Sequence, residues 1–396
     1  MERRHFLKQS ALASSLVFVP SFVRAFETIG GNALGFKKLV IIQMSGGNDG
    51  LNTIVPFNND IYYRNRPSIA IKKSDLLKVT DELGFHQSLS PLKSLYDKGH
   101  LSIINNVGYP NPNRSHFRST DIWQTASNSD EYLNTGWLGR YMDVYGDKPY
   151  TGIELDDSLS LILKGEKLNG IATKNPAILY RNMHTPYFDK VLEQQTDDHL
   201  SEHNLGYLYK TMIEAKSSAN YIYETSKTYQ SNFDYPDNPF GKQLKTTAEF
   251  INSNLQSKVY YVSMGGFDTH AGQLNRQSRL LETYSNAMEV FVKDLEHNDT
   301  FKDTLILTFS EFGRRLEQNA ANGTDHGAAN NIFLIGKNLK KPGFYNEMPN
   351  LSHLDTNNDL IHTVDFRSVY ATILDQWLEV DDETILNKSF SKLKFF

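Results

Sequence analysis

The chain has 396 residues, enough to bury a large core, and its aromatic content of 12% is too high for a disordered protein. Its 41 Lys and Arg residues against 46 Asp and Glu residues give a formal net charge of -5, which offers no broad attraction to phosphate backbones and argues against a nucleic-acid binder. Because there is no Cys, disulfides, thiolate zinc sites and cysteine nucleophiles are excluded, and any metal must bind to oxygen and nitrogen.

Residues 1–25 have the pattern of an export signal. Arg3 and Arg4 precede an apolar stretch at 11–23, which is too short and too broken by serines and a proline to span a bilayer. The paired arginines followed by Phe-Leu-Lys resemble a twin-arginine signal, with an ordinary basic amphipathic helix as the alternative. Cleavage would leave residues 26–396, and we expect this mature protein to be periplasmic or secreted and to have no integral membrane segment.

Short apolar runs predict buried strands. The first run ends in a glycine loop, as expected for a strand that is buried on both faces. The runs cover residues 39–44, 101–104, 259–262, 305–309 and 332–335. Apolar residues also recur every three or four positions over 244–255, 281–295 and 367–379, which predicts amphipathic helices.

Strands that alternate with amphipathic helices indicate an α/β fold with a mainly parallel central sheet and helices on both faces. We expect residues 26–396 to form a single domain. The polar segment at about 151–235 has weaker strand signals, and we expect it to be an insertion or lid.

Polar residues that can bind ligands stand next to each predicted strand. In open α/β sheets, ligands bind at the carboxyl ends of the strands, where loops and helix amino termini gather. The candidates in chain order are Asp49, Ser115, Asp268, His270, Glu311 and His326. Collected at one sheet edge, they would supply three carboxylates, two imidazoles and a hydroxyl, a mixture that divalent cations favour.

Each of these motifs also has an ordinary structural interpretation. Residues 48–50, Asn-Asp-Gly, are a hairpin-turn signature, and residues 325–327 could form another turn. Ser115 is a good helix N-cap, which would make His116 a surface residue. Asp268 could cap a second helix, and Glu311 could pair with a nearby arginine at a helix start. The metal interpretation therefore depends on the joint placement of these residues.

The chain resembles a known family over about residues 39–378. The segments that carry the resemblance are LVIIQMSGGNDGLNTIVPF, NRSHFRSTDIWQTA, GGFDTH, LILTFSEFGRR, TDHGAANNIFLIG and DFRSVYATILDQW. They resemble the exported bacterial family known as domain of unknown function 1501, which is grouped with the alkaline phosphatase and sulfatase superfamily. The resemblance implies an alkaline phosphatase-like three-layer sandwich and a metal-dependent hydrolase of small anionic esters, with phosphate favoured over sulfate.

The resemblance also implies a role for each candidate. Asp268, His270 and His326 match the ligands of one metal ion. Asp49 and Glu311 match ligands of a second ion, but the superfamily imidazole that would complete this site is replaced by Phe312. The implied cofactor is one or two divalent ions, with zinc first and manganese, calcium or magnesium as alternatives.

For a competent site the resemblance implies that the Ser115 hydroxyl attacks phosphorus. Arg118, one turn further along the predicted helix, could fork onto two anionic oxygens, with Arg114, Arg314 and Arg315 as alternatives. The lack of Cys and the spacing from Ser115 to Arg118 disfavour a formylglycine sulfatase.

Two other functions compete with this interpretation. A Ser-His-Asp esterase is disfavoured because there is no Gly-x-Ser-x-Gly elbow and because Ser115 and His116 would diverge by about 100° on a helix. An exported binding or assembly protein that keeps the fold without turnover stays open. Phe312 and the short Asp-x-His spacing at 268–270 favour it, whereas the other retained strand-end residues favour an enzyme.

Overall fold

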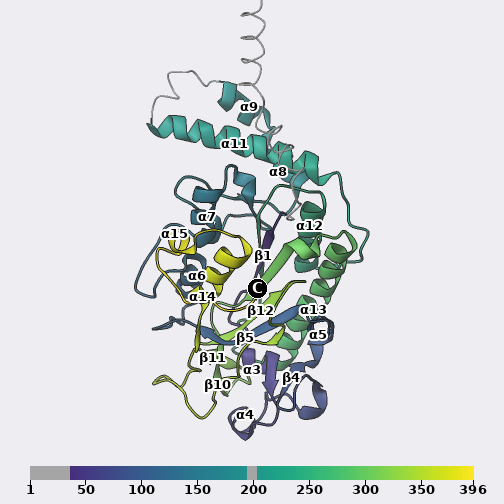
Figure 1. Ribbon diagram of the computed structural model, residues 1–396, viewed down its shortest axis with the longest axis vertical. Coiled ribbons are helices and arrows are strands. Elements are labelled where there is room, and N and C mark those ends of the chain that lie inside the picture. The colour runs from purple at the N-terminus through teal and green to yellow at the C-terminus, as the bar shows by residue number, and fades with distance from the viewer. Residues whose placement is uncertain (1–35, 194–202) are drawn as a thin grey trace, which may run out of the picture. The chain divides into compact units, whose positions relative to one another are not determined.

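The continuous apolar runs build a central sheet of nine strands (Figure 1). All five predicted strands form, as β1 (Lys38–Met44), β5 (Leu101–Gly108), β8 (Val259–Met264), β9 (Thr304–Phe309) and β12 (Asn330–Ile335). The strand order is β13-β5-β12-β9-β1-β8-β6-β7, with β14 paired to β5. The computed structural model describes residues 36–193 and 203–396, and residues 37–396 belong to one compact unit.

The sheet is mainly parallel, as expected, with one informative exception. β1 pairs in parallel with both β8 and β9, and the short strands β6 (Gly152–Glu154), β7 (Ile171–Ala172), β13 (Gly343–Phe344) and β14 (Val364–Asp365) are parallel to their neighbours. β12 instead runs antiparallel to β9 and β5. Residues that precede β12 therefore lie at the same sheet edge as residues that follow the parallel strands.

Helices cover both faces of the sheet, which confirms the three-layer α/β arrangement (Figure 1). Alternate β1 residues point to opposite faces, so that Val40 and Ile42 join one apolar cluster while Leu39 and Ile41 join the other. The first cluster includes apolar residues of α5 (Ser90–Asp97), α12 (Pro239–Asn252) and α13 (Gln273–His297). The second includes residues of α6 (His116–Thr125), α7 (Trp137–Tyr145), α14 (Phe366–Thr372), the π-helical turn Ile373–Trp377 and α15 (Asp382–Leu386).

Smaller elements pack beside the central sheet. β2 (Ile54–Pro56), β4 (Leu83–His86) and β3 (Leu76–Lys78) form a three-stranded antiparallel sheet, next to the short helices α3 (Gly50–Thr53) and α4 (Asp60–Asn65). β10 (Arg314–Gln318) and β11 (Thr324–His326) form a hairpin between β9 and β12. Of these two additions, the β10–β11 hairpin contributes His326 to the candidate site.

The segment at 151–235 is part sheet and part helix. It contributes the edge strands β6 and β7, which are too short to leave an apolar pattern in the sequence. It then forms α8 (Pro176–Met183), α9 (Pro186–Glu193) and α11 (His203–Ser226), and α11 contacts both α8 and α12. A lid function for these helices stays a prediction.

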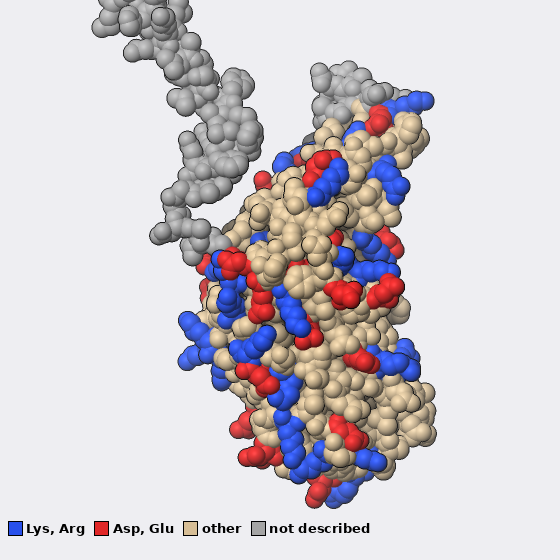
Figure 2. Space-filling model, turned by 90° about the vertical axis from the view of Figure 1, so that its right-hand side faces the viewer, with Lys and Arg blue, Asp and Glu red and all other residues tan. Residues whose placement is uncertain are grey.

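The predicted twin-arginine signal at residues 1–25 lies outside the described residues. Within the described ranges, 36–193 and 203–396, no helix is both long and apolar enough to cross a membrane. On the face shown in Figure 2, acidic and basic side chains are interspersed, as the near-equal numbers of the two charges lead one to expect.

Candidate metal centre

The loop that follows β1 brings two other strand ends close to it. Gly46 and Gly47 have φ angles of 119° and 73°, in the region that favours glycine. A Cβ at Gly46 would lie 2.4 Å from the backbone nitrogen of Asp268, and one at Gly47 would lie 2.3 Å from the Phe312 ring. Both glycines are therefore needed for the loops after β8 and β9 to pack directly against the loop after β1.

A buried guanidinium ties these loops together. The Arg314 side chain is fully buried and donates hydrogen bonds to the carbonyls of Gly47 (2.6 Å), Thr324 (2.8 Å) and Phe267 (3.1 Å). It also donates to the Asp268 carboxylate at 2.8 Å. Arg314 thereby fixes the position of Asp268 relative to the β10–β11 hairpin, in which Arg314 is the register partner of His326.

Three histidines meet at this point, and each is anchored through Nδ1. His116 Nδ1 lies 2.8 Å from a Glu311 oxygen, His270 Nδ1 lies 3.2 Å from an Asp325 oxygen, and His326 Nδ1 lies 2.7 Å from the Arg114 carbonyl. A carbonyl can only accept, so His326 Nδ1 must carry the proton, and its Nε2 has a free lone pair when the ring is neutral. Histidines that bind metals have this arrangement, with the second ring nitrogen donating to a carboxylate or carbonyl.

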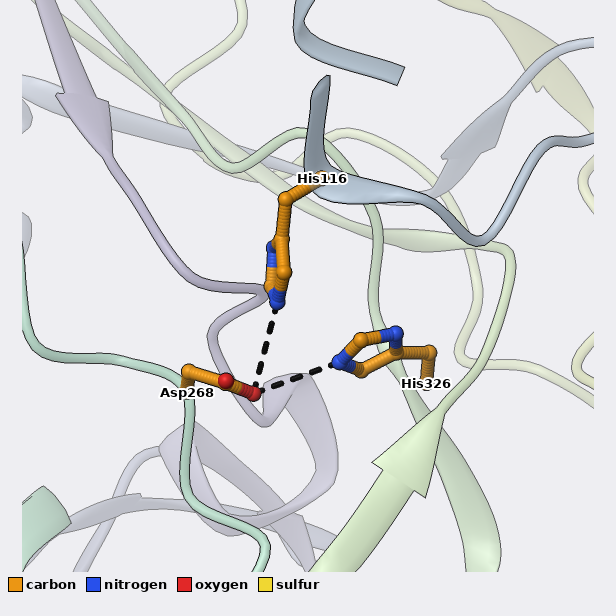
Figure 3. Close-up of side chains that lie close together, drawn as sticks. All are labelled: His116, Asp268 and His326. Atoms are coloured by element: carbon orange, nitrogen blue, oxygen red, sulfur yellow. Dashed lines mark hydrogen bonds and ion pairs between the residues drawn. The ribbon is translucent and has the colours of Figure 1, made fainter. Parts of the chain in front are cut away.

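The three Nε2 atoms converge on one oxygen, Asp268 Oδ1. It lies 3.4 Å from His116 Nε2, 3.1 Å from His270 Nε2 and 3.2 Å from His326 Nε2, and Figure 3 shows the first and last of these approaches. Ligands at about 2.0–2.1 Å from a tetrahedral zinc ion lie about 3.3 Å apart. His116, Asp268 and His326 offer ligand atoms that all lie within 4.8 Å of one another, so the donor set fits a divalent ion.

Burial and neighbouring charges shift the pKa of three groups in the cluster. Burial alone would raise the pKa of Asp268, but the hydrogen bond and the charge of Arg314 outweigh it and hold that pKa well below its usual range. Burial lowers the pKa of His326, whereas the hydrogen bond to Glu311 raises the pKa of His116. His116 Nε2 is buried and has no hydrogen-bond partner among the described residues.

The structure brings Asp268, His270 and His326 together, but it places Glu311 in a different position. The Glu311 carboxylate is fully buried behind His116, where it also accepts the Gly46 amide at 2.8 Å. His116, which a simple N-cap interpretation would leave on the surface, occupies the place in front of it. The Phe312 ring, with its centroid 4.9 Å from that of His116 and 4.6 Å from that of His326, packs against both imidazoles.

Asp49 lies in a separate, closed cluster. One of its oxygens pairs with Arg66 at 2.6 Å, and both side chains are almost completely buried. The same oxygen accepts a hydrogen bond from Gln273 at 2.5 Å, and the other caps α3 by accepting the Leu51 amide at 3.1 Å. The partners of the Asp49 carboxylate are thus a cation and amides of the protein itself.

The predicted nucleophile and its predicted arginine differ in their surroundings. Ser115 is exposed at the start of α6, directly before His116, and forms no capping hydrogen bond within the described chain. Arg118 is buried and points elsewhere, donating to the carbonyls of Asn128 and Ser129 and lying 3.9 Å from the centroid of the Tyr132 ring.

Two other arginines share one buried carboxylate. Arg114 donates from Nε to the buried carboxylate of Asp359 at 2.7 Å, and Arg315 lies 3.4 Å from the same carboxylate. Arg114 itself contacts the histidine cluster only through its backbone carbonyl, which accepts from His326 Nδ1. The cluster thus combines a carboxylate, three imidazoles and the buried Arg314 guanidinium at one edge of the sheet.

Comparisons with known proteins give one family and several similar folds. A family model described as "Protein of unknown function (DUF1501)" matches residues 36–390. No curated protein matches the chain. The chain is similar to the C-terminal periplasmic domain of EcEptC from Escherichia coli, in complex with Zn, with 13% identity, a TM-score of 0.38 and coverage of 76% of this chain and 72% of that one.

Two further solved structures are similar at the same level. A sulfatase from Pseudoalteromonas sp. is 10% identical, with a TM-score of 0.41 and coverage of 94% of this chain and 76% of that one. A protein in the alkaline phosphatase superfamily from Vibrio parahaemolyticus is 10% identical, with a TM-score of 0.40 and coverage of 89% and 70%. With identities and scores this low, the likenesses assign no role to any residue.

Proposed function

The chain belongs to the DUF1501 family, and we propose that it is a metal-dependent hydrolase of phosphate esters, with a divalent ion held by His116, Asp268, His270 and His326. Zinc is the first choice, because three imidazole nitrogens and one carboxylate oxygen are ligands that it accepts. We also propose that residues 1–25 direct export by the twin-arginine route, so that the enzyme acts in the periplasm or outside the cell.

The observation that carries this proposal is the common orientation of the three imidazoles. His326 gives its only N–H to the Arg114 carbonyl, so its Nε2 lone pair faces Asp268 Oδ1 at 3.2 Å. Two acceptors at this separation repel one another unless a positive charge lies between them. The alternative is that His270 Nε2, which lies 2.9 Å from His326 Nε2, carries a proton and donates it to that lone pair, with the Arg314 guanidinium as the only cation on Asp268.

The bound ion would supply Lewis acidity toward an ester oxygen, which would have to bind as a ligand in addition to the protein side chains. The chain itself provides the remaining chemistry. Ser115 Oγ, exposed beside His116, forms a bond to phosphorus while the ester P–O bond breaks, and the alcohol leaves with the serine proton. Water then hydrolyses the phosphoserine to phosphate and restores the hydroxyl.

The arginines have distinct parts in this scheme. Arg114 and Arg315 share one carboxylate, that of Asp359, and the pair therefore keeps a net positive charge that can hold the anionic oxygens of the ester. Arg118 binds backbone carbonyls instead, and we assign it the role of positioning α6 and the 128–132 loop.

A second candidate function is an exported binding or assembly protein that holds a metal ion without turnover. The commitment of Arg118 to the 128–132 loop favours it, because that side chain does not face the cluster. The two functions share the metal site and differ in what Ser115 does.

The test begins with metal analysis of the purified full-length protein, followed by release of phosphate from an aryl phosphate. We expect zinc to bind at a single site per chain and Ser115→Ala to lower kcat by roughly a thousandfold or more while the zinc content stays the same. Metal binding without turnover would favour the binding protein. Failure to bind zinc, manganese, calcium or magnesium would contradict the site itself.

A further inference from the structure

A cavity of about 850 Å³ opens at the ends of β6, β7 and β8 and the start of α12, and it shares the loop after β8 with the candidate metal centre. Gly265 lines it, and Asp268 follows three residues later in the same loop, so the two residues are at most about 11 Å apart. This cavity, which we name the β8 cleft, has the size of a site for a small organic molecule. A group attached to an ester bound at Asp268 can reach it.

The charges of the β8 cleft cancel one another. Of its two lysines, Lys174 pairs with Asp157 at 2.6 Å and Asp156 at 3.0 Å, and Lys242 pairs with Asp237 at 2.7 Å, so neither lysine is a free positive charge. The cleft thus has no surplus charge with which to hold a second anionic group. A ligand with several phosphates would find no free positive charge here, whereas an uncharged group does not require one.

Neutral hydrogen-bonding groups line the same space. Gln243 uses its Nε2 on the Leu155 carbonyl at 2.6 Å, and its Oε1 accepts no hydrogen bond from the described residues. The hydroxyls of Ser263 and Thr283 likewise have no partner within the described chain. Next to them, Phe240, Pro239 and Met264 give the cleft an apolar part. Hydroxyls and amide oxygens beside an apolar surface suit a sugar or another polyol.

We propose that the β8 cleft binds the uncharged, hydroxyl-rich alcohol of the ester, so that the substrate class is a phosphate monoester or diester of a sugar or polyol. This inference rests on the proposed function, because it assumes that the ester group is bound at Asp268. It adds the part of the substrate that the metal centre does not touch.

Gly265 offers a direct way to close the cleft. A Cβ built at this glycine meets no atom within 4 Å, and its φ angle is one that other residues adopt. Gly265→Trp therefore fills the cavity without a clash at the backbone, and Gly265→Ala is the matched control that leaves it open. Neither change alters a residue of the proposed metal centre.

The experiment compares phosphate release from glucose 6-phosphate and from methyl phosphate by the zinc-loaded full-length protein. We expect the unchanged protein to prefer the sugar phosphate by roughly tenfold or more in kcat/KM, Gly265→Ala to keep this preference and Gly265→Trp to abolish it. An equal loss on both substrates in Gly265→Trp, or no preference in the unchanged protein, would overturn the inference.

A binding measurement separates this inference from the proposed function. Methyl glucoside, which has no phosphate, is titrated by calorimetry into the metal-free protein and into Gly265→Trp. Binding that Gly265→Trp removes, without turnover of any phosphate ester, would refute the hydrolase but keep the cleft as a site for neutral polyols. Turnover of methyl phosphate without glucoside binding or sugar preference would refute the cleft alone.

Discussion

Two carboxylates at the same edge of the sheet have opposite surroundings. Asp49 follows β1 and is almost completely buried, with Arg66, Gln273 and helix amides as its partners. Asp268 follows β8, and about half of its side chain is exposed, facing three imidazoles. The first cluster is closed by the protein's own donors, whereas the second is half exposed and, in the proposed function, holds a divalent ion.

The difference in burial suggests different roles: the Asp49 cluster stabilises the fold, whereas the Asp268 cluster is available for ligand binding. A buried ion pair leaves no ligand position open, and its loss exposes an unpaired charge to the protein interior. A half-exposed carboxylate such as that of Asp268 loses less when a partner is removed, because water can solvate its charge. Both carboxylates lie at strand ends, so this position alone does not distinguish a structural carboxylate from a ligand-binding one. The hydrogen-bond and ion-pair partners of each side chain make the distinction.

The largest effect that we expect is the loss of stability in Asp49→Asn. The amide keeps an oxygen for the cap of α3 but leaves the Arg66 guanidinium, which is fully buried, without its counter-ion. Breaking a buried pair in this way costs about 3–5 kcal/mol. Urea unfolding of the metal-free protein measures the change in the free energy of unfolding.

Asp268→Asn is the matched control. The Asp268 carboxylate is about half exposed whereas that of Asp49 is almost completely buried, so we expect a smaller loss of stability but a loss of metal binding. If Asp49→Asn removed the metal and left the free energy of unfolding unchanged, the comparison between the two clusters would be reversed.

The fold could be predicted because its signals are local. Continuous apolar runs marked the five main strands, and recurrences of three and four residues marked α12, α13 and α14. β6 and β7 have three and two residues, too few for any periodicity to show. The antiparallel direction of β12 also had no local signal, although it is this direction that brings His326 to the shared edge.

The site could be predicted only in part, because side-chain partners are not local. Asp268, His270 and His326 stood out by their positions next to strands. The pairing of Asp49 with Arg66, 17 residues later, follows no motif and depends on how α3 packs beside β10. For His116, the sequence showed a helix start but not that its ring turns inward to Glu311.

A buried histidine near the Asp49–Arg66 cluster makes the stability of the protein depend on pH. His86, at the end of β4, is almost completely buried and lines the same cavity as Arg66. Burial lowers its pKa from 6.5 to about 4. The unfolded chain therefore binds a proton near pH 6.5 that the folded protein accepts only near pH 4. Neutral His86 therefore costs no stability above pH 6.5. As the pH drops from 6.5 toward 4, the free energy of unfolding falls by about 3 kcal/mol on account of this residue.

His86→Asn tests this dependence. The amide oxygen can still accept the Ser88 amide, which His86 Nδ1 accepts at 3.1 Å, and the side chain does not titrate. Urea unfolding of both metal-free proteins between pH 7 and 4.5 should show a steeper loss of stability in the unchanged protein. Parallel curves for the two proteins would mean that His86 is protonated without cost in the folded state.

The smallest effect that we expect concerns Glu311, which is buried like Asp49 but contacts the histidine cluster around Asp268. It is as fully buried as Asp49, yet its carboxylate orients an imidazole of the open cluster. In Glu311→Gln an amide oxygen can still accept from His116 Nδ1, so the ring keeps its place but loses the negative charge behind it. Changes of this kind typically weaken metal binding about 10–100-fold.

Competition with a chromophoric chelator measures the zinc affinity of Glu311→Gln. Asp325→Asn provides the control, because Asp325 contacts His270 Nδ1 at a longer distance, 3.2 Å against 2.8 Å, and is half exposed to solvent. We expect its effect to be smaller, since water screens an exposed charge. Equal affinities in Glu311→Gln and the unchanged protein would imply that His116 does not bind the ion. The metal centre would then consist of Asp268, His270 and His326 alone. His116 and Glu311 would form a second closed pair like that of Asp49 and Arg66.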